Sequence, residues 1–460
     1  MTADAADAGP RPGHWVSDAN QALLTDLYQL TMAQAYLMEG MRDEAVFSLF
    51  ARRLPDQRNY LLACGLDDAL HCLETARFDE AALAYLATLP WFRAEFLDWL
   101  RAFRFRGDVY AVPEGTPVFA GEPLLEVVAP IAEAQLAETI LLNQVHFETV
   151  VASKASRVVD AAAGRRVVDF GLRRMHGADA GLKAARACYL AGVHATSNVL
   201  GGWCYGIPVA GTMAHSYVQA HDREPDAFRR FLALYPETIL LVDTYDTLAG
   251  VDQVIALARE LGPRFRARGI RLDSGDLGAL AVEARRRLDA AGLTGVEIFA
   301  SSGLDEYQIA ALVARGAPID GFGVGAAMGV AADAPVLDMV YKLAAYAGKA
   351  RLKTSPGKEI LPGRKQVYRI EAEGRAVRDV IALAGEDHPG RPLLRPVMRR
   401  GERLAEDRDT LEAARQRARD ERDRLPPELR GIEPARPGYP VTVSPGLEAL
   451  RRQARSAVGA

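Results

Sequence analysis

Cysteine is scarce in this chain: there are four in 460 residues, Cys64, Cys72, Cys188 and Cys204. No two of them form a C-x-x-C pair. The spacing therefore excludes a disulfide-rich scaffold and a structural zinc site built on such pairs. Sparse, unpaired cysteines favour a reducing, intracellular compartment.

Long hydrophobic runs are also absent. The most apolar stretches, such as Thr238 to Val242, are far shorter than the roughly 18–20 residues that span a bilayer. The first fourteen residues contain no basic segment followed by an apolar one, so we expect no signal peptide. Together these absences predict a soluble, cytoplasmic protein without membrane partners.

The chain carries no large excess of charge of either sign. Its 56 basic and 60 acidic residues give a net charge of −4, which argues against bulk nucleic-acid binding. Hydrophobic residues make up 49% and charged residues 25%, as in average globular proteins, so extensive disorder is not expected. The length is sufficient for two or three domains.

Six short apolar runs, each followed by a helical pattern, divide the middle of the chain. They start 26 to 40 residues apart, the spacing of strands joined by crossover helices. This repetition predicts a closed or nearly closed α/β barrel, although an open doubly wound sheet has the same period. The runs begin at Val167, Ile207, Ile239, Ile270, Val296 and Phe322.

The remaining patterns suggest three parts. We expect an N-terminal α/β domain over 15–130, to which residues 350–400 return, a catalytic barrel over 131–349, and a charged helical extension over 401–460. Strands are predicted at Ala45 to Phe50 and Val109 to Val112, and a long helix at about Ile131 to Ala163. Thr25 is the expected N-cap of an earlier helix. The charge-dense stretch from Leu404 to Leu425 is predicted to be a solvated surface helix.

Polar residues gather where the six runs end. Arg173 and Arg174 follow the first run, His215 the second and Asp243 the third, while Asp273 and Asp276 follow the fourth. Arg271 lies within an apolar run, where a charge requires an anion from the protein or a ligand. Each feature alone has an ordinary explanation, such as a helix cap or a turn. Meeting on one rim, they predict a phosphorylated substrate, metal-assisted transfer and a histidine that acts as base or nucleophile.

These motifs resemble the nicotinate phosphoribosyltransferase family from about Leu24 to Arg369. The similarity is carried by several segments in register. They are Leu24 to Gln29, Phe47 to Leu54, Phe170 to Arg174, Gly211-Thr212-Met213-Ala214-His215-Ser216, Leu272 to Leu277 and Tyr341-Lys342-Leu343.

The resemblance implies a type II phosphoribosyltransferase: an irregular α/β barrel packed against a smaller α/β domain formed from both chain ends. It implies that nicotinate and phosphoribosyl pyrophosphate give nicotinate mononucleotide and pyrophosphate in NAD salvage, with ATP as co-substrate and Mg²⁺ as cofactor. It also implies a homodimer whose subunits share active sites.

Residue roles follow from the same resemblance. His215 corresponds to the histidine that ATP phosphorylates, and we expect Asp243 to bond one of its ring nitrogens. Phe170, together with Tyr28 from the neighbouring subunit, would sandwich the pyridine ring, and Arg271 and Thr212 would approach its carboxylate. Asp273 would contact the ribose or Mg²⁺. The phosphate and pyrophosphate groups would be bound by Arg173, Gly303, Gly323, Gly325 and, more weakly, Arg53.

Two positions qualify the resemblance. Ala326 stands where relatives often carry a hydroxyl residue, which leaves backbone N–H groups to bind the phosphate. Ser197 aligns with an aspartate of the nicotinamide-specific sister family. Because Ser197 and Asn198 carry no negative charge and Arg271 favours an anion, we expect nicotinate rather than nicotinamide.

Other assignments agree less well with the residues. An enzyme of the same fold could act on nicotinamide or on quinolinate, but the latter needs a second basic cluster. A sugar-phosphate lyase would need a Schiff-base lysine at a strand end, and none of the six ends has one. A degenerate binding protein should have lost His215 or the Asp273 to Asp276 turn, and both are present.

Overall fold

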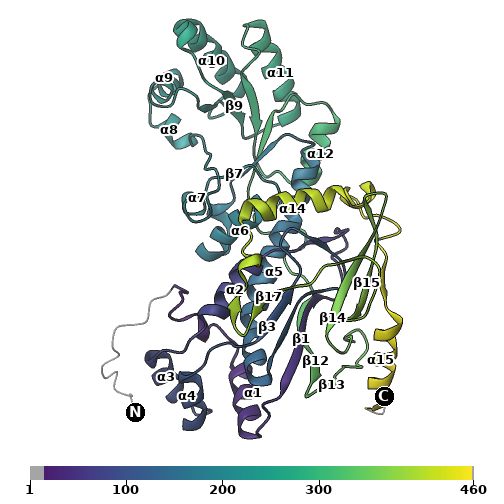
Figure 1. Cartoon of the computed structure of the whole chain (residues 1–460). Coiled ribbons are helices and arrows are strands. Elements are labelled where there is room, and N and C mark those ends of the chain that lie inside the picture. Colours follow the sequence, from purple (N-terminus) through teal and green to yellow (C-terminus); the bar gives the residue numbers. More distant parts are fainter. Residues whose placement is uncertain (1–14, 458–460) are drawn as a thin grey trace.

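The computed structural model describes residues 15–457, which form a sheet-rich part and a barrel-like part joined by one long helix (Figure 1). That helix, α5 (Ile131–Ala161), confirms the long helix predicted for this segment. It packs against α1 (Leu27–Met38) of the sheet-rich part and against α6 (Ala178–Leu190) of the barrel. Most of its residues are buried because it has neighbours on nearly every side.

The sheet-rich part is built from both ends of the chain. Its seven-stranded sheet has the order β13-β12-β1-β5-β3-β17-β18, and every pairing within it is antiparallel. Strands β1 and β3 confirm the two predicted strands. The bounds are β1 (Glu44–Ala51), β3 (Asp108–Ala111), β5 (Pro123–Pro130), β12 (Met339–Tyr346), β13 (Lys349–Ala350), β17 (Arg395–Arg399) and β18 (Glu402–Arg403).

A second sheet of four strands, β16-β14-β15-β19, and a two-stranded pair, β2-β4, complete this part. The strands are β2 (Leu61–Leu62), β4 (Pro117–Val118), β14 (Lys365–Ala372), β15 (Arg375–Leu383), β16 (Arg391–Pro392) and β19 (Val441–Val443). Helices α2 (Leu66–Thr75), α3 (Glu80–Ala87), α4 (Ala94–Arg101) and α15 (Pro445–Ala457) belong to the same part of the molecule. The N-cap of α1 is Asp26, not Thr25 as predicted.

The barrel part holds a six-stranded parallel sheet of order β7-β6-β11-β10-β9-β8. The strand that comes last in the sequence, β11, therefore pairs with the one that comes first, β6, as in a barrel. Val209 extends β7 through a single parallel bridge to Thr196, but no ladder of the described residues joins it to β8. The expected α/β barrel is thus a half-barrel, open at the run that contains Pro208. The strands are β6 (Arg166–Asp169), β7 (Ala195–Thr196), β8 (Ile239–Leu241), β9 (Gly269–Leu272), β10 (Glu297–Ala300) and β11 (Gly321–Val324).

Helices alternate with these strands and cover the outside of the half-barrel. The apolar faces of all of these helices except α7 share one core with the strands. The strands are continuous apolar runs because both faces of the sheet are covered. The helices are α7 (Val199–Tyr205), α8 (His215–Gln219), α9 (Glu224–Leu234), α10 (Thr247–Leu261), α11 (Leu277–Ala290), α12 (Glu306–Ala314) and α13 (Ala326–Gly329). None of the helices within 15–457 is both long and apolar enough to cross a membrane.

The charged segment near the C-terminus differs from its prediction. Helix α14 (Leu411–Asp423) is shorter than the expected 404–425, and one face of it is buried against α6. Arg415 donates to the carbonyl oxygens of Tyr189, Gly192 and Val193, which close the C-terminal end of α6. The arginines that suggested solvation instead bind carbonyl groups that a helix end leaves unpaired.

Candidate active site at the rim of the half-barrel

His215 lies at the first position of α8, directly after the loop that follows the Val209 run. Its Nδ1 is 3.2 Å from the hydroxyl oxygen of Thr244, and its Nε2 is 3.6 Å from Oδ2 of Asp273. The side chain is 40% exposed, so a ligand can reach the ring. The imidazole therefore stands between a hydroxyl and a carboxylate at the carboxyl ends of β8 and β9.

Asp243 does not contact the ring, contrary to our expectation. Its Oδ2 accepts hydrogen bonds from the Asp273 N–H at 2.8 Å and the Ser274 hydroxyl at 2.6 Å. Asp243 thus fixes the turn that carries Asp273, while Thr244, the next residue, takes the place at Nδ1. The sequence could not distinguish the two neighbours, because which side chain faces the ring depends on how β8 ends.

Arg271 pairs with the carboxylate of Asp273, as expected for a charged residue in an apolar strand. Its Nη1 lies 3.2 Å from Oδ1 of Asp273 and donates to the Ser301 hydroxyl at 3.0 Å. Its Nη2 donates to the carbonyl of Met213 at 3.0 Å, which ties the strand to the loop before His215. Burial lowers the pKa of Arg271 despite the nearby Asp273, but an arginine remains charged.

Phe170 lies beside this cluster because two glycines leave room for it. A side chain at Gly323 would approach the Phe170 ring to 2.5 Å, and one at Gly325 would come within 3.3 Å of the Phe170 carbonyl oxygen. Ser301, which bonds Arg271, borders the same glycine. Ser301 therefore links the Arg271 guanidinium to the glycine against which the Phe170 ring packs.

The turn after β10 has open space around it and two residues with positive φ. Ser302 has φ = 105° and Gly303 has φ = 59°, and a side chain at Gly303 would meet no atom within 4 Å. Arg173 lies exposed in the 3₁₀ turn Leu172–Arg174, close enough to Arg271 to lower its pKa. Open backbone and an exposed guanidinium are suited to phosphate oxygens.

Three predicted residues lie elsewhere. Thr212 donates its hydroxyl to the Met213 carbonyl and lines an outer groove with Thr238 and Arg266. Tyr28, on α1, and Arg53, after β1, belong to the sheet-rich part. Tyr28 is 48% exposed, and the Arg53 side chain is 81% exposed with Asp338 at 3.4 Å. No described contact brings either one to His215. Asp276 is the N-cap of α11, which is the ordinary explanation for that residue.

The rim offers carboxylate oxygens of the kind that Mg²⁺ prefers. Asp243 Oδ1 is buried without a hydrogen-bond partner, and Asp273 Oδ2 faces the imidazole. Mg²⁺ is typically held by one or two carboxylates together with substrate phosphates and water. The residues present therefore fit a magnesium ion that arrives with a phosphorylated substrate.

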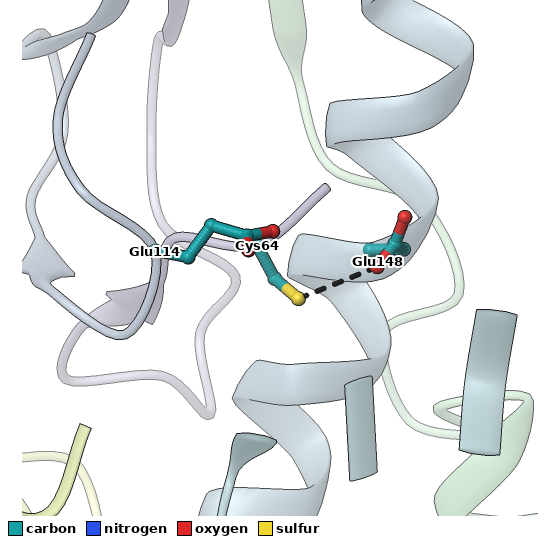
Figure 2. A group of neighbouring side chains, drawn as sticks. All are labelled: Cys64, Glu114 and Glu148. Carbon is teal, nitrogen blue, oxygen red and sulfur yellow. Dashed lines mark hydrogen bonds between the residues drawn. The ribbon is translucent and has the colours of Figure 1, made fainter. Parts of the chain in front are cut away.

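Another potential metal-ligand group lies away from the rim, between the two parts of the molecule. Cys64, Glu114 and Glu148 are buried with their ligand atoms within 4.8 Å of one another (Figure 2). Arg186 already donates to both carboxylates, at 2.6 to 2.9 Å, and approaches the Cys64 sulfur at 3.7 Å. A metal ion would be repelled by this guanidinium, so we assign the group a structural role.

Comparison with known proteins identifies the family. Residues 23–146 match the model of the nicotinate phosphoribosyltransferase N-terminal domain. The chain is 58% identical over 423 residues to nicotinate phosphoribosyltransferase pncB2 of Mycobacterium tuberculosis, covering 92% of this chain and 91% of the relative. It is 42% identical over 379 residues to the Bacillus subtilis nicotinate phosphoribosyltransferase, covering 80% of this chain and 77% of the relative.

A solved structure agrees over almost the whole chain. The crystal structure of human nicotinic acid phosphoribosyltransferase superposes with a TM-score of 0.84 at 33% identity, covering 93% of this chain and 99% of the human one. The relatives and the human structure confirm the resemblance seen in the sequence. The chain belongs to the nicotinate phosphoribosyltransferase family.

Proposed function

We propose that this protein transfers the phosphoribosyl group of phosphoribosyl pyrophosphate to nicotinate, giving nicotinate mononucleotide and pyrophosphate in cytoplasmic NAD salvage. The supporting observation is that Ser301 accepts a hydrogen bond from the buried Arg271 and also borders Gly323, against which the Phe170 ring packs. A buried cation next to an aromatic ring suits a flat ring that carries a carboxylate. The Ser197 and Asn198 side chains add no negative charge that would repel such a ligand.

We further propose that ATP hydrolysis is coupled to the transfer through a phosphohistidine at His215. The Nε2 lone pair would attack the γ-phosphorus of ATP, the bond to the β-phosphate oxygen would break, and ADP would leave. Nδ1 would keep its proton and donate a hydrogen bond to the Thr244 hydroxyl oxygen, which lies 3.2 Å away. Thr244 would thereby hold the tautomer whose Nε2 can attack.

Mg²⁺, when bound, would offset the negative charge of the transferring phosphates. Asp273 and Asp243 are its proposed protein ligands. Asp273 has a second role in this chain, because its Oδ1 pairs with Arg271 while its Oδ2 faces His215. Arg173, Gly303, Gly323 and Gly325 would bind the phosphoribosyl and pyrophosphate oxygens, and Arg53 a pyrophosphate oxygen.

The active site would be completed by a second subunit. Tyr28 lies on α1, away from Phe170, and is half exposed in the single chain. Apolar side chains on α7 are exposed as well: Val199 at 72% and Trp203 at 83%. We propose a homodimer in which such surfaces meet and Tyr28 of the partner subunit stacks on the pyridine ring. Thr212 is proposed to help bind the nicotinate carboxylate.

The direct test follows two products in one reaction. Purified protein is incubated with phosphoribosyl pyrophosphate, Mg²⁺ and either nicotinate or nicotinamide, with and without ATP. We expect nicotinate mononucleotide and ADP to form together, and His215→Ala to abolish ADP release. Comparable turnover of nicotinamide would contradict the proposed substrate.

A matched pair of variants tests the role of Thr244. Thr244→Val removes the hydroxyl at nearly constant shape and should slow phosphate incorporation from ATP by about threefold to tenfold, the equivalent of one hydrogen bond. Thr244→Ser keeps the hydroxyl and should retain most of the rate. Equal rates for the valine and serine variants would refute the role.

A further inference from the structure

Five charged side chains form a cluster near the two glycine turns of the rim; four are buried and the fifth, Asp333, is partly exposed. Lys154 on α5 lies 2.6 Å from Oε2 of Glu306 and 2.8 Å from Oδ1 of Asp333. Arg157 donates to Glu306 at 2.9 Å, and Arg58 bonds both oxygens of Asp333, at 2.6 and 3.1 Å. The Lys154 side chain is only 2% exposed.

The cluster contains one more cation than anion. Its carboxylates are ionised, because the neighbouring cations outweigh burial and hold the pKa values of Glu306 and Asp333 below their usual range. Each carboxylate has an arginine of its own: Arg157 for Glu306 and Arg58 for Asp333. Lys154 bridges the two complete pairs and adds a third positive charge. An uncompensated buried charge is costly, so pairing within the cluster does not explain this lysine.

The position of the extra charge indicates what it serves. Glu306 is the first residue of α12, three residues after Gly303, and Asp333 follows α13, the helix that begins after Gly325. Helix α5 packs against both α12 and α13. The Lys154 ammonium therefore lies between the elements that follow the two proposed phosphate-binding turns.

We propose that Lys154 is a positioning residue for the phosphate groups of phosphoribosyl pyrophosphate. Its surplus charge attracts them through the protein interior, and its bridge holds the Gly303 and Gly325 turns at a fixed separation. This inference rests on the proposed function for the identity of the ligand. Lys154 itself does not touch the ligand, since its side chain is only 2% exposed and its ammonium is held by Glu306 and Asp333.

The test is equilibrium binding of phosphoribosyl pyrophosphate with Mg²⁺, measured by calorimetry on the full chain. Lys154→Met should weaken this binding about fivefold or more, as expected for loss of a buried unit charge near an anion. Nicotinate binding and kcat should change much less. The thermal unfolding temperature should stay constant or rise, because each carboxylate keeps its arginine and the surplus charge is gone.

Lys365→Met provides the matched control. Lys365 is a similarly buried lysine, but in the sheet-rich part, where it lies 3.0 Å from the fully buried Glu126. Removing it leaves a buried carboxylate without its cation. We therefore expect a lower unfolding temperature with unchanged affinity for phosphoribosyl pyrophosphate, the opposite of the Lys154→Met result.

Each outcome decides something. Equal affinities of wild-type and Lys154→Met protein for phosphoribosyl pyrophosphate overturn this inference and leave the proposed function intact. A destabilised or unfolded Lys154→Met protein also overturns it, since the carboxylates would then need the lysine. Wild-type protein that binds phosphoribosyl pyrophosphate but forms no nucleotide overturns only the proposed function. Absence of phosphoribosyl pyrophosphate binding overturns both.

Discussion

Arg271 is the residue on which the proposed substrate choice depends. It is 9% exposed and engages Asp273, Ser301 and the Met213 carbonyl, which fixes the direction of its guanidinium. Its Nε is buried without a hydrogen-bond partner. Asp273 is the carboxylate that pairs with Arg271 in the single chain. The carboxylate of a bound ligand would be a second anion next to the same guanidinium.

Replacing this guanidinium should therefore affect one substrate selectively. Arg271→Gln should raise the KM for nicotinate about tenfold to a hundredfold, the range for losing a charge-assisted hydrogen bond. The KM for phosphoribosyl pyrophosphate should change less, as measured by initial rates with each substrate varied in turn. A variant with an unaltered preference for nicotinate over nicotinamide would contradict the assigned role.

At this scale, the sequence predicted which residues gather but not how they pair. Asp243, Asp273 and Arg271 follow or lie within the paired parallel strands β8 and β9, so topology brings them to one rim, and His215 follows the preceding apolar run of the sequence. The contact between His215 and Thr244 depends on side-chain direction after β8, and the Lys154 cluster depends on how α5 packs on α12 and α13. Periodicity carries no information on either. The roles of Tyr28 and Arg53 stay predictions, because a second subunit is needed to place Tyr28 near the rim.

Among the helices, α14 shows how composition can mislead. Its high charge predicted a solvated surface, yet Ala414, Ala418, Glu421 and Arg422 are buried. The helix closes the C-terminal end of α6 with arginine donors, and Arg417 also donates to the Glu114 carbonyl. A regular charge pattern does not tell a solvated face from one that binds exposed carbonyl groups.

Arg415 is expected to account for much of this attachment. Arg415→Ala should lower the free energy of unfolding by about 1–3 kcal/mol, because the Gly192 and Val193 carbonyls lose the arginine donor and the Tyr189 carbonyl keeps only the Gly192 N–H. Chemical denaturation measures the change. Arg419→Ala, at an exposed position of the same helix, is the control and should have little effect. Equal losses from the two substitutions would show that Arg415 does not attach α14 to α6.

For the whole molecule, the junction between the two parts is the most consequential feature. Cys64 and Glu114 come from the sheet-rich part and Glu148 from α5 (Figure 2). Arg186, from α6 of the barrel, donates to both carboxylates. Burial, reinforced by Asp68, raises the pKa of Glu148 well above its usual range. Burial also opposes ionisation of Glu114, but Arg186 and two backbone N–H groups hold its pKa below the usual value.

These opposite shifts predict opposite pH effects. A raised folded-state pKa gives Glu148 a contribution to stability that is present below the unfolded pKa of about 4.3 and is lost as pH rises through the folded pKa. Glu148→Gln should therefore raise the free energy of unfolding more at pH 8 than at pH 5.

Glu114→Gln should do the reverse. A lowered pKa gives stability that is present above pH about 4.3, so this substitution should destabilise the protein most at pH 8. Denaturant unfolding of both variants at the two pH values is the measurement. Matching effects of the two substitutions at pH 8 would contradict the opposite directions of the two pKa shifts.

The imidazole of His215, at the rim of the half-barrel, is the proposed acceptor of phosphate from ATP. Protein incubated with ATP labelled at the γ-phosphate, digested and mapped under alkaline conditions, tests this role most directly. We predict one acid-labile phosphate per chain on the peptide containing His215, absent from His215→Ala and released when phosphoribosyl pyrophosphate and nicotinate are added. Label on a different peptide, or none on wild-type protein, would contradict the account.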